Sequence, residues 1–185
     1  VHTAMVKRIA AAGHEVACHG YAHELVWRQS PQEFRGDVRL AKQILEDLTG
    51  QPVVGYRAPN YSIRADMAWA LDVLAEEGFR YDSSAYPILH DRYGMPGSPR
   101  FFYRIARNGL IEFPIGTIRL LGVNLPIGGG GYFRLFPTAW VRRGIRRVNG
   151  VRAIRDHQVA GARRTRASST CRGMLSGGFL DSIHR

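Results

Sequence analysis

Cysteine and long apolar runs are both scarce in this chain of 185 residues. Its two cysteines, Cys18 and Cys171, are too few to form the disulfide framework of a small secreted domain. Cys18 lies within a short apolar run, which favours a buried free thiol over a metal ligand. No apolar run approaches the roughly 20 residues that a helix needs to cross a bilayer. We therefore expect neither a disulfide-stabilised fold nor a transmembrane segment.

Acidic residues are also few, at 15 Asp and Glu against 26 Lys and Arg, which gives a formal net charge of +11. The excess is uneven, because residues 1–140 hold 15 basic and 13 acidic side chains, whereas residues 141–185 hold 11 and 2. No nucleic-acid-binding motif accompanies this charge, so we do not expect a nucleic-acid partner. We predict a domain of residues 1–150 and, over residues 151–185, a basic tail that is poorly ordered because it lacks apolar periodicity.

The start of the chain carries no targeting signal. Val1-His2-Thr3-Ala4 has no initiating methionine and does not resemble a signal peptide. We expect the chain to begin inside a longer protein.

Helical and extended patterns alternate in the first half of the chain, which predicts an α/β fold with parallel strands and crossover helices. Ser30-Pro31-Gln32-Glu33 has the form of a capping box that opens a helix, and Gly50 ends that helix. After Asp82 the pattern changes to a long loop over residues 86–108. The predicted helices are 4–12, 31–49, 65–77 and 138–147, and the predicted strands are 15–18, 52–56, 79–81, 110–113 and 117–121; we predict no secondary structure from about Arg152 onward.

Three polar residues, His19, Arg57 and Asp82, each follow the carboxyl end of a predicted strand. In barrel-like α/β folds the chemistry is placed at this edge of the sheet. The position of these three side chains therefore indicates a functional site, independently of any resemblance.

Each candidate has a structural alternative. His19 and His23 are spaced so that one helical turn would present both to a divalent ion, but two histidines leave a catalytic zinc site incomplete. Arg57 either holds a carboxylate or ties a loop to backbone carbonyls. Asp82 either acts in the site or caps a turn. The Gly128–Gly131 run lacks phosphate-binding spacing, so we interpret it as a loop.

Several stretches, in order, resemble polysaccharide deacetylases with the NodB-homology domain: AAAGHEVACHGYAHELV, GYRAPNYSI and GFRYDSSAYPILHDRYG. The later stretch IEFPIGTIRLLGVNLPIGGGGYFRLFP looks like the subgroup found with bacterial exopolysaccharide and exosortase systems. The resemblance covers roughly residues 1–150. It implies a partial, distorted (β/α) barrel whose first strand is missing, in the bacterial cytoplasm or in the periplasm or cell envelope.

The resemblance also implies an activity, the hydrolysis of N-acetyl groups on a polysaccharide or oligosaccharide. His19 and His23 would be ligands of a divalent metal ion, expected to be zinc. Arg57 would orient the carboxylate of the catalytic base, and the backbone N–H of Asn60 would help to stabilise the oxyanion.

Two further residues would meet the substrate. Many members of the family carry Tyr at the position of Asn60; here Tyr61 follows one place later and is the expected sugar contact. Asp82 would lie at the edge of the substrate groove.

Two parts of the family pattern are missing from this sequence. The paired aspartates that provide the base and a third metal ligand would precede Val1, and the Leu-x-His motif that provides the general acid should follow the helix near Arg147. His157 and His184 lack its flanking pattern, and the abrupt change in composition after Gly150 motivates the hypothesis of a shifted reading frame. We expect an enzyme that is inactive as this fragment. The alternatives are a catalytically dead carbohydrate-binding module and, weakened by the charge distribution, a nucleic-acid-binding protein.

Overall fold

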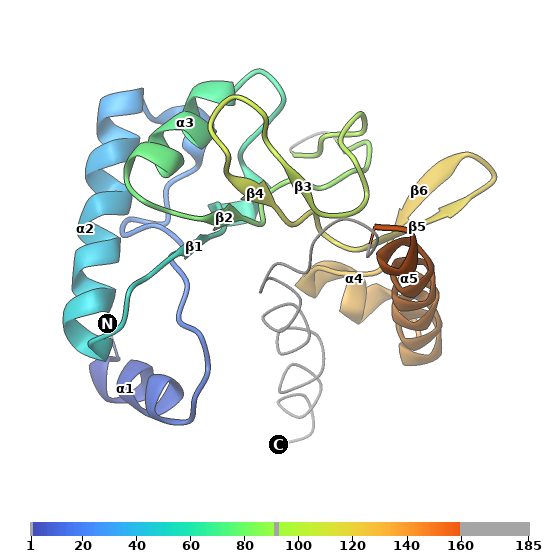
Figure 1. Cartoon of the computed structure of the whole chain (residues 1–185), viewed down its shortest axis with the longest axis horizontal. Coiled ribbons are helices and arrows are strands. Elements are labelled where there is room, and N and C mark those ends of the chain that lie inside the picture. The colour runs from blue at the N-terminus through green and yellow to red at the C-terminus, as the bar shows by residue number, and fades with distance from the viewer. Residues whose placement is uncertain (1, 91–92, 160–185) are drawn as a thin grey trace. The chain divides into compact units, whose positions relative to one another are not determined.

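The computed structural model describes residues 2–90 and 93–159, with the backbone alone for residues 151–159. Its contacts divide the chain into two units, Val1–Arg146 and Arg147–Arg185. The first unit contains the sheets, the helices α1 to α4 and the start of α5 (Figure 1). The described part of the second unit is the remainder of helix α5.

Three helices precede or connect the strands of the main sheet: α1 (Thr3–Ala11), α2 (Pro31–Thr49) and α3 (Ala68–Glu76). The predicted capping box at the start of α2 is confirmed, because the Ser30 hydroxyl accepts from the Glu33 N–H and the Glu33 carboxylate accepts from the Ser30 N–H. The left-handed conformation of Gly50 ends the helix as predicted.

The main sheet has the order β1-β2-β4-β3, with β1 (Gly55–Tyr56), β2 (Tyr81–Asp82), β4 (Ile111–Glu112) and β3 (Tyr103–Arg104). Strands β1, β2 and β4 are parallel, and β3 runs antiparallel to β4. The predicted strand 15–18 contributes a single parallel bridge, from Cys18 to Tyr56. Helix α2 connects this bridge to β1, and α3 connects β1 to β2, so the predicted α/β class with crossover helices is confirmed.

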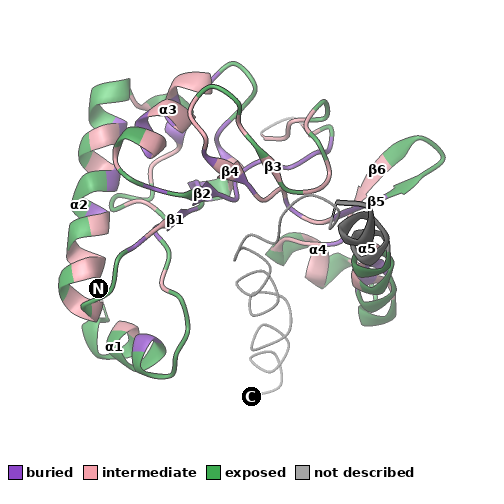
Figure 2. Ribbon diagram, viewed as in Figure 1, coloured by how far each residue is buried: buried purple, intermediate pink, exposed green. Residues whose placement is uncertain are grey.

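Buried residues gather along the strands and on the inner faces of α2 and α3 (Figure 2). Phe34 of α2 packs edge-on against Tyr56 of β1 at 5.8 Å and against Trp69 of α3 at 5.7 Å between ring centroids. These aromatic contacts link both helices to the sheet, and edge-to-face pairs of this kind stabilise beyond their burial.

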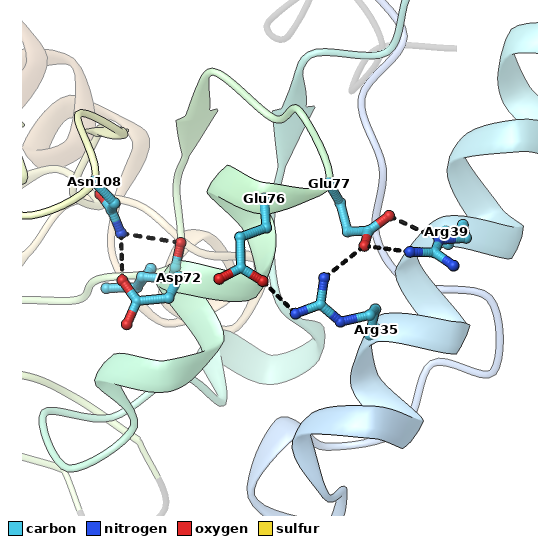
Figure 3. A network of polar contacts seen from close by, with 7 residues as sticks. Arg35, Arg39, Asp72, Glu76, Glu77 and Asn108 are labelled. Carbon is cyan, nitrogen blue, oxygen red and sulfur yellow. Dashed lines mark hydrogen bonds and ion pairs between the residues drawn. The ribbon is translucent and has the colours of Figure 1, made fainter.

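Helices α2 and α3 are also joined by charged side chains at the surface (Figure 3). Glu77 accepts from Arg39 at 2.7 Å and from Arg35 at 2.8 Å, while Arg35 also pairs with Glu76. The hydrogen bond from Arg39 is the main cause that lowers the pKa of Glu77. The network fixes the two helices that cover the sheet, although exposed ion pairs contribute little stability individually.

The C-terminal part of the described chain differs from the prediction in several places. The β5 strand (Thr117–Leu120) was predicted, but its partner β6 (Val123–Pro126) and the short β3 were not. The glycine run was predicted as a loop, whereas α4 (Gly130–Leu135) begins within it.

Helix α5 (Thr138–Val159) continues well beyond the predicted end at Arg147. Gly150 does not end it because helix-forming Arg and Ala residues follow and no proline intervenes. The expectation of no secondary structure from Arg152 was therefore wrong up to Val159, and the rest of the predicted tail lies outside the described residues. No helix within residues 2–90 and 93–159 is long and apolar enough to cross a membrane.

Candidate functional site

A cavity of about 590 Å³ opens at the carboxyl ends of the strands in the first unit. The loops that follow Cys18 and β1 form one part of its wall, and the segment after β2, the glycine run and α4 form the other. Five of the six predicted site residues line it: His19, His23, Arg57, Asn60 and Tyr61. Two segments at least 34 positions apart in the sequence are thus brought together, and His19 and Arg57 lie at the edge where the strand-end argument placed them.

The two histidines lie close together, but the chain between them is not helical. Their rings meet edge to face at 5.1 Å between centroids. The intervening loop contains Gly20 at φ +79°, and His23 itself has φ +55°, so the geometry expected from one helical turn was wrong. The pairing comes instead from a tight loop, whose left-handed residues turn both imidazoles into the cavity.

Asp37 of α2 holds this loop in place. Its carboxylate accepts from the backbone N–H groups of Tyr21 at 2.9 Å and Ala22 at 2.8 Å. A side chain at Gly20 would meet the same carboxylate, because a Cβ there would lie 2.9 Å from Oδ2. Asp37 therefore positions the histidine pair without lining the cavity.

The backbone of Arg57 sets the orientation of His19. Nδ1 of His19 lies 2.6 Å from the carbonyl oxygen of Arg57. A carbonyl oxygen can only accept, so Nδ1 carries the hydrogen and Nε2 of the neutral ring is free to bind a metal. Burial lowers the pKa of His19, and the charges of His23 and Arg57 add to this effect, while the hydrogen bond to the Arg57 carbonyl opposes it. The net lowering of the pKa favours the neutral form.

The described residues supply only part of a metal site. No group of three or more His, Cys, Asp or Glu side chains in residues 2–90 and 93–159 is arranged to hold an ion. Cys18 does not line the cavity; it is buried and free, and burial raises the pKa of its thiol to about 11. The prediction of a buried thiol is confirmed for Cys18, while Cys171 lies outside the described residues.

The guanidinium of Arg57 is held by Ser83 at the end of β2. Nε donates to the Ser83 carbonyl at 3.0 Å, and Nη2 donates to the Ser83 hydroxyl at 2.8 Å. The Ser83 hydroxyl in turn donates to the carbonyl of Phe113 at 2.7 Å. These contacts match the structural alternative for Arg57, yet the side chain also lines the cavity, and a guanidinium has five N–H donors. Arg57 can be fixed by Ser83 and still present donors to a ligand.

Backbone strain is concentrated at the cavity. Among the described residues, four non-glycine positions have positive φ, and three of them line the cavity: His23, Asn60 and Tyr61. Asn60 and Tyr61, at +50° and +54°, lie in the short 3-10 turn Pro59–Tyr61. Strain of this kind costs energy and is typical of functional sites, where the surrounding structure enforces it.

Asp82 does not lie at the groove edge as predicted. It is fully buried and is not among the residues that line the cavity. Its carboxylate accepts from the Ser84 hydroxyl at 2.6 Å, and the Ser84 oxygen accepts from the N–H of Ala58 at 2.8 Å. Asp82 belongs to strand β2 instead of following it, so its side chain points into the interior and supports the loop that carries Arg57.

A second buried acid, Glu112 of β4, is the register partner of Asp82 and hydrogen-bonds to it. Burial raises the pKa of Glu112 to about 11, and the charge of Asp82 adds to this effect. Burial also raises the pKa of Asp82. The pair therefore keeps a proton at neutral pH, with Glu112 as the neutral partner, and the Glu112 carboxyl also accepts from the Ala85 N–H at 3.0 Å.

The sequence analysis did not identify several other side chains in or near the cavity. Asp37, Ser83 and Glu112 carry no motif, because their role depends on which backbone groups the fold places beside them. His90, Tyr93 and Tyr132 also line the cavity; the first two lie in the predicted loop 86–108, and Tyr132 follows the glycine run. The density of aromatic residues after β2 was the one signal that could have identified that wall.

Comparisons with known proteins relate the two halves of the chain to two different family models. Residues 1–81 match the family model of polysaccharide deacetylase, and residues 83–155 match a domain of unknown function (DUF3473). A peptidoglycan deacetylase-like protein of Gibberella zeae is 38% identical over 78 residues, which are 42% of this chain and 22% of that protein. The peptidoglycan deacetylase of Helicobacter pylori is 33% identical over 88 residues, 48% of this chain and 28% of that protein.

A solved structure assigned to the polysaccharide deacetylases, from Mycobacterium smegmatis, is similar to 62% of this chain and 36% of its own, with a TM-score of 0.51 and 31% identity. This likeness confirms the predicted fold class of a partial barrel. The chain spans only between 22% and 36% of the lengths of these three proteins. The finer assignment to an exosortase-associated subgroup stays a prediction.

Proposed function

We propose that this chain is part of a hydrolase that deacetylates an N-acetylated glycan. The match of residues 1–81 to the polysaccharide deacetylase model and the similarity to two peptidoglycan deacetylase-type proteins support the proposal. In the reaction, water adds to the acetamide carbonyl carbon, the C–N bond breaks, and the nitrogen takes a proton. The products are acetate and a free amino sugar. The observation that carries the proposal is the presence of His19, His23 and Arg57 in one cavity.

The histidine pair fits two ligand positions of a divalent ion. Imidazole nitrogen suits zinc, and the hydrogen bond from Nδ1 of His19 to a backbone carbonyl is the usual outer-shell support of such a ligand. When bound, the ion would supply positive charge that polarises the carbonyl and lowers the pKa of a water molecule.

The remaining roles fall to three neighbours. Arg57, fixed by Ser83, would hold a carboxylate through the N–H groups that Ser83 does not use. The N–H of Asn60 would donate to the oxygen that becomes negative as water adds. Tyr61, half-buried against other aromatic rings, would contact the sugar.

The part of the chain that the structure describes does not complete the machinery. The residues that line the cavity include no Asp or Glu, so no described side chain there can act as the carboxylate base. We propose that a longer protein containing this chain is active and that this chain alone is not. The lack of a carboxylate also favours a second candidate, a carbohydrate-binding module without catalysis.

Acetate release separates the two candidates. The measurement uses N-acetylchitotetraose and purified peptidoglycan, the substrate named for the relatives, with zinc or with a chelator. The longer protein should release acetate only with metal, and the chain alone should release none. Losing a general base or acid typically slows a reaction ~100- to 10,000-fold. Chelator-sensitive acetate release by the chain alone would overturn the assignment of roles. A longer protein that releases no acetate would favour the binding module.

Arg57→Ala in the longer protein tests the role of this side chain. Because Arg57 would orient the base and would not be a ligand of the metal, turnover should fall while metal content stays unchanged. Arg64→Ala is the matched control, since Arg64 does not line the cavity. Full turnover in Arg57→Ala would contradict the role.

A further inference from the structure

One side of the cavity has no role in the proposed function. His19, His23 and Arg57 come from residues 1–81, the part that matches the deacetylase model. Residues 83–155, which match a domain of unknown function, contribute His90, Tyr93, Gly129 and residues of α4 that include Tyr132. The boundary between the two matches thus passes through the cavity.

Three half-buried tyrosines form this side of the cavity: Tyr61, Tyr93 and Tyr132, referred to here as the tyrosine wall. All three pack around the buried Tyr86, in a cluster separate from the main core. The ring of Tyr86 stacks on Tyr93 at 5.8 Å and 8°, and it meets Tyr61 at 5.2 Å and Tyr132 at 6.1 Å edge to face. The wall tyrosines thus pack against the cluster and also line the cavity, and the ring of Tyr93 stacks in addition on the ring of His90 at 3.8 Å between centroids.

Hydrogen bonds fix the segments that carry the wall. The Tyr86 hydroxyl donates to the Gly128 carbonyl at 2.6 Å, and the Tyr86 carbonyl accepts from the Met95 N–H at 2.7 Å. Gly129, at φ +96°, lies beside the rings, where a Cβ would be in ordinary contact with Tyr132 at 3.5 Å and with the Tyr61 hydroxyl at 3.6 Å. The rings are thus held in place before any ligand arrives, which reduces the entropy lost on binding.

The chemistry of the lining narrows the ligand class. The titratable side chains in the lining, besides the tyrosines, are three histidines and one arginine, and no carboxylate is present to attract a cation. Aromatic faces and phenol hydroxyls together suit a neutral ligand with apolar C–H faces and a rim of hydrogen-bonding groups. A pyranose ring has this character.

We propose that the tyrosine wall is a subsite for a pyranose ring of the glycan, next to the ring whose acetamide group faces His19 and His23. The identity of the ligand rests on the proposed deacetylase function. The segment matched by the domain of unknown function then gives the protein its preference for an oligomer over a single sugar, because it binds a ring that does not react.

Binding in the absence of metal tests the subsite without requiring catalysis. Isothermal titration of the chain, with chelator present, measures N-acetylchitotetraose and N-acetylglucosamine. The tetramer should bind more tightly than the monomer. Tyr93→Ala and Tyr132→Ala should each weaken the tetramer roughly 10-fold, given typical energies of aromatic contacts, and should remove most of the preference over the monomer. Tyr132→Phe keeps the ring and should bind within about twofold of the parent.

Two further variants guard against misfolding. Leu135 lines the cavity and is 76% exposed, so Leu135→Asp should fold normally and still weaken the tetramer. Phe102→Ala removes an aromatic ring that is 48% exposed but does not line the cavity, and should leave binding unchanged.

The outcomes separate this inference from the proposed function. Tyrosine-dependent binding of the tetramer by the chain, without acetate release by the longer protein, supports the subsite and contradicts the deacetylase. The subsite alone is overturned if the longer protein releases acetate from the tetramer and the KM for the tetramer is unchanged in Tyr93→Ala and Tyr132→Ala. Both variants must unfold like the parent for this comparison. Equal binding of tetramer and monomer by the parent chain also overturns it.

Discussion

The hydroxyl of Tyr86 donates a hydrogen bond to the backbone carbonyl of Gly128 at 2.6 Å, across 42 positions of sequence. Tyr86 lies in the segment after β2, and Gly128 begins the glycine run that leads into α4. Burial raises the pKa of the Tyr86 phenol well above its ordinary range, so the hydroxyl keeps its proton and remains a donor. This contact holds two sides of the cavity wall together.

Tyr86→Phe removes the contact and keeps the ring. We expect the free energy of unfolding to fall by about 1 kcal/mol, because a half-buried carbonyl loses its partner. Urea unfolding followed by circular dichroism measures the change. Tyr21→Phe, at a tyrosine that is 56% exposed, is the control and should have no effect. An unchanged free energy in Tyr86→Phe would show that the bond does not contribute to holding the glycine run.

Asp37 should influence metal binding although it does not line the cavity. Asp37→Ala removes the two acceptors that fix the loop between His19 and His23. Loss of such outer-shell support commonly costs 10- to 100-fold in metal affinity, and we expect roughly 10-fold for zinc. Competition titration with a chromophoric zinc chelator provides the measurement.

Two control variants bracket the zinc affinity expected for Asp37→Ala. Asp47→Ala lies on the exposed side of the same helix and should bind zinc like the parent. The double variant His19→Ala, His23→Ala should lose most of the affinity, because it removes both ligands. If Asp37→Ala matches Asp47→Ala, the loop holds its shape without the aspartate; if the double variant binds like the parent, the histidines are not the ligands.

The sequence predicted the order of helices and parallel strands because the apolar spacing and the caps are local signals. The α2 helix illustrates this, since both its capping box and its terminal glycine are confirmed. The C-terminal part was harder to predict. Strand β3 was missed; it pairs with β4 over only two residues, so tertiary contacts and not local pattern decide its position.

The candidate site was predictable where a residue follows the end of a strand. His19 and Arg57 lie where this argument placed them, and Asp82 does not. Arg57 is the first residue after β1, whereas Asp82 is the last residue of β2. This offset of one residue turns the two side chains to opposite sides, because neighbouring positions in a strand alternate. The shape of the His19–His23 loop could not be predicted either, since it depends on positive φ angles that Asp37 and the surrounding backbone enforce.

Ser30→Ala tests how much the cap of α2 contributes. The variant loses the hydroxyl that accepts from the Glu33 N–H, and removal of such a cap typically costs about 1 kcal/mol. Thermal and urea unfolding should both show the loss. Gln32→Ala, at an exposed position in the same turn, serves as the control and should stay within about 0.5 kcal/mol of the parent. Equal stability of the two variants would mean that the box forms without stabilising the helix.

The last prediction concerns the buried acids Asp82 and Glu112. Burial and the charge of Asp82 raise the pKa of Glu112 from 4.5 to about 11, so between these values the folded chain holds a proton that the unfolded chain releases. A group that binds its proton more tightly in the folded state lowers stability as pH rises, by at most about 1.4 kcal/mol per pH unit. We expect the contribution of this group to the free energy of unfolding to decline steadily from about pH 5 upward.

Glu112→Gln should remove this decline. The amide is neutral at every pH, can donate to Asp82 in place of the carboxyl proton, and keeps an oxygen to accept from the Ala85 N–H. Unfolding by urea at pH 5, 7 and 9 should therefore show a flatter pH dependence than in the parent, with the largest relative gain in stability at pH 9. Asp47→Asn, which changes an exposed acid on α2, should retain the pH dependence of the parent. A Glu112→Gln curve that runs parallel to that of the parent would mean that the buried pair holds no proton, because only proton release from this pair distinguishes the two slopes.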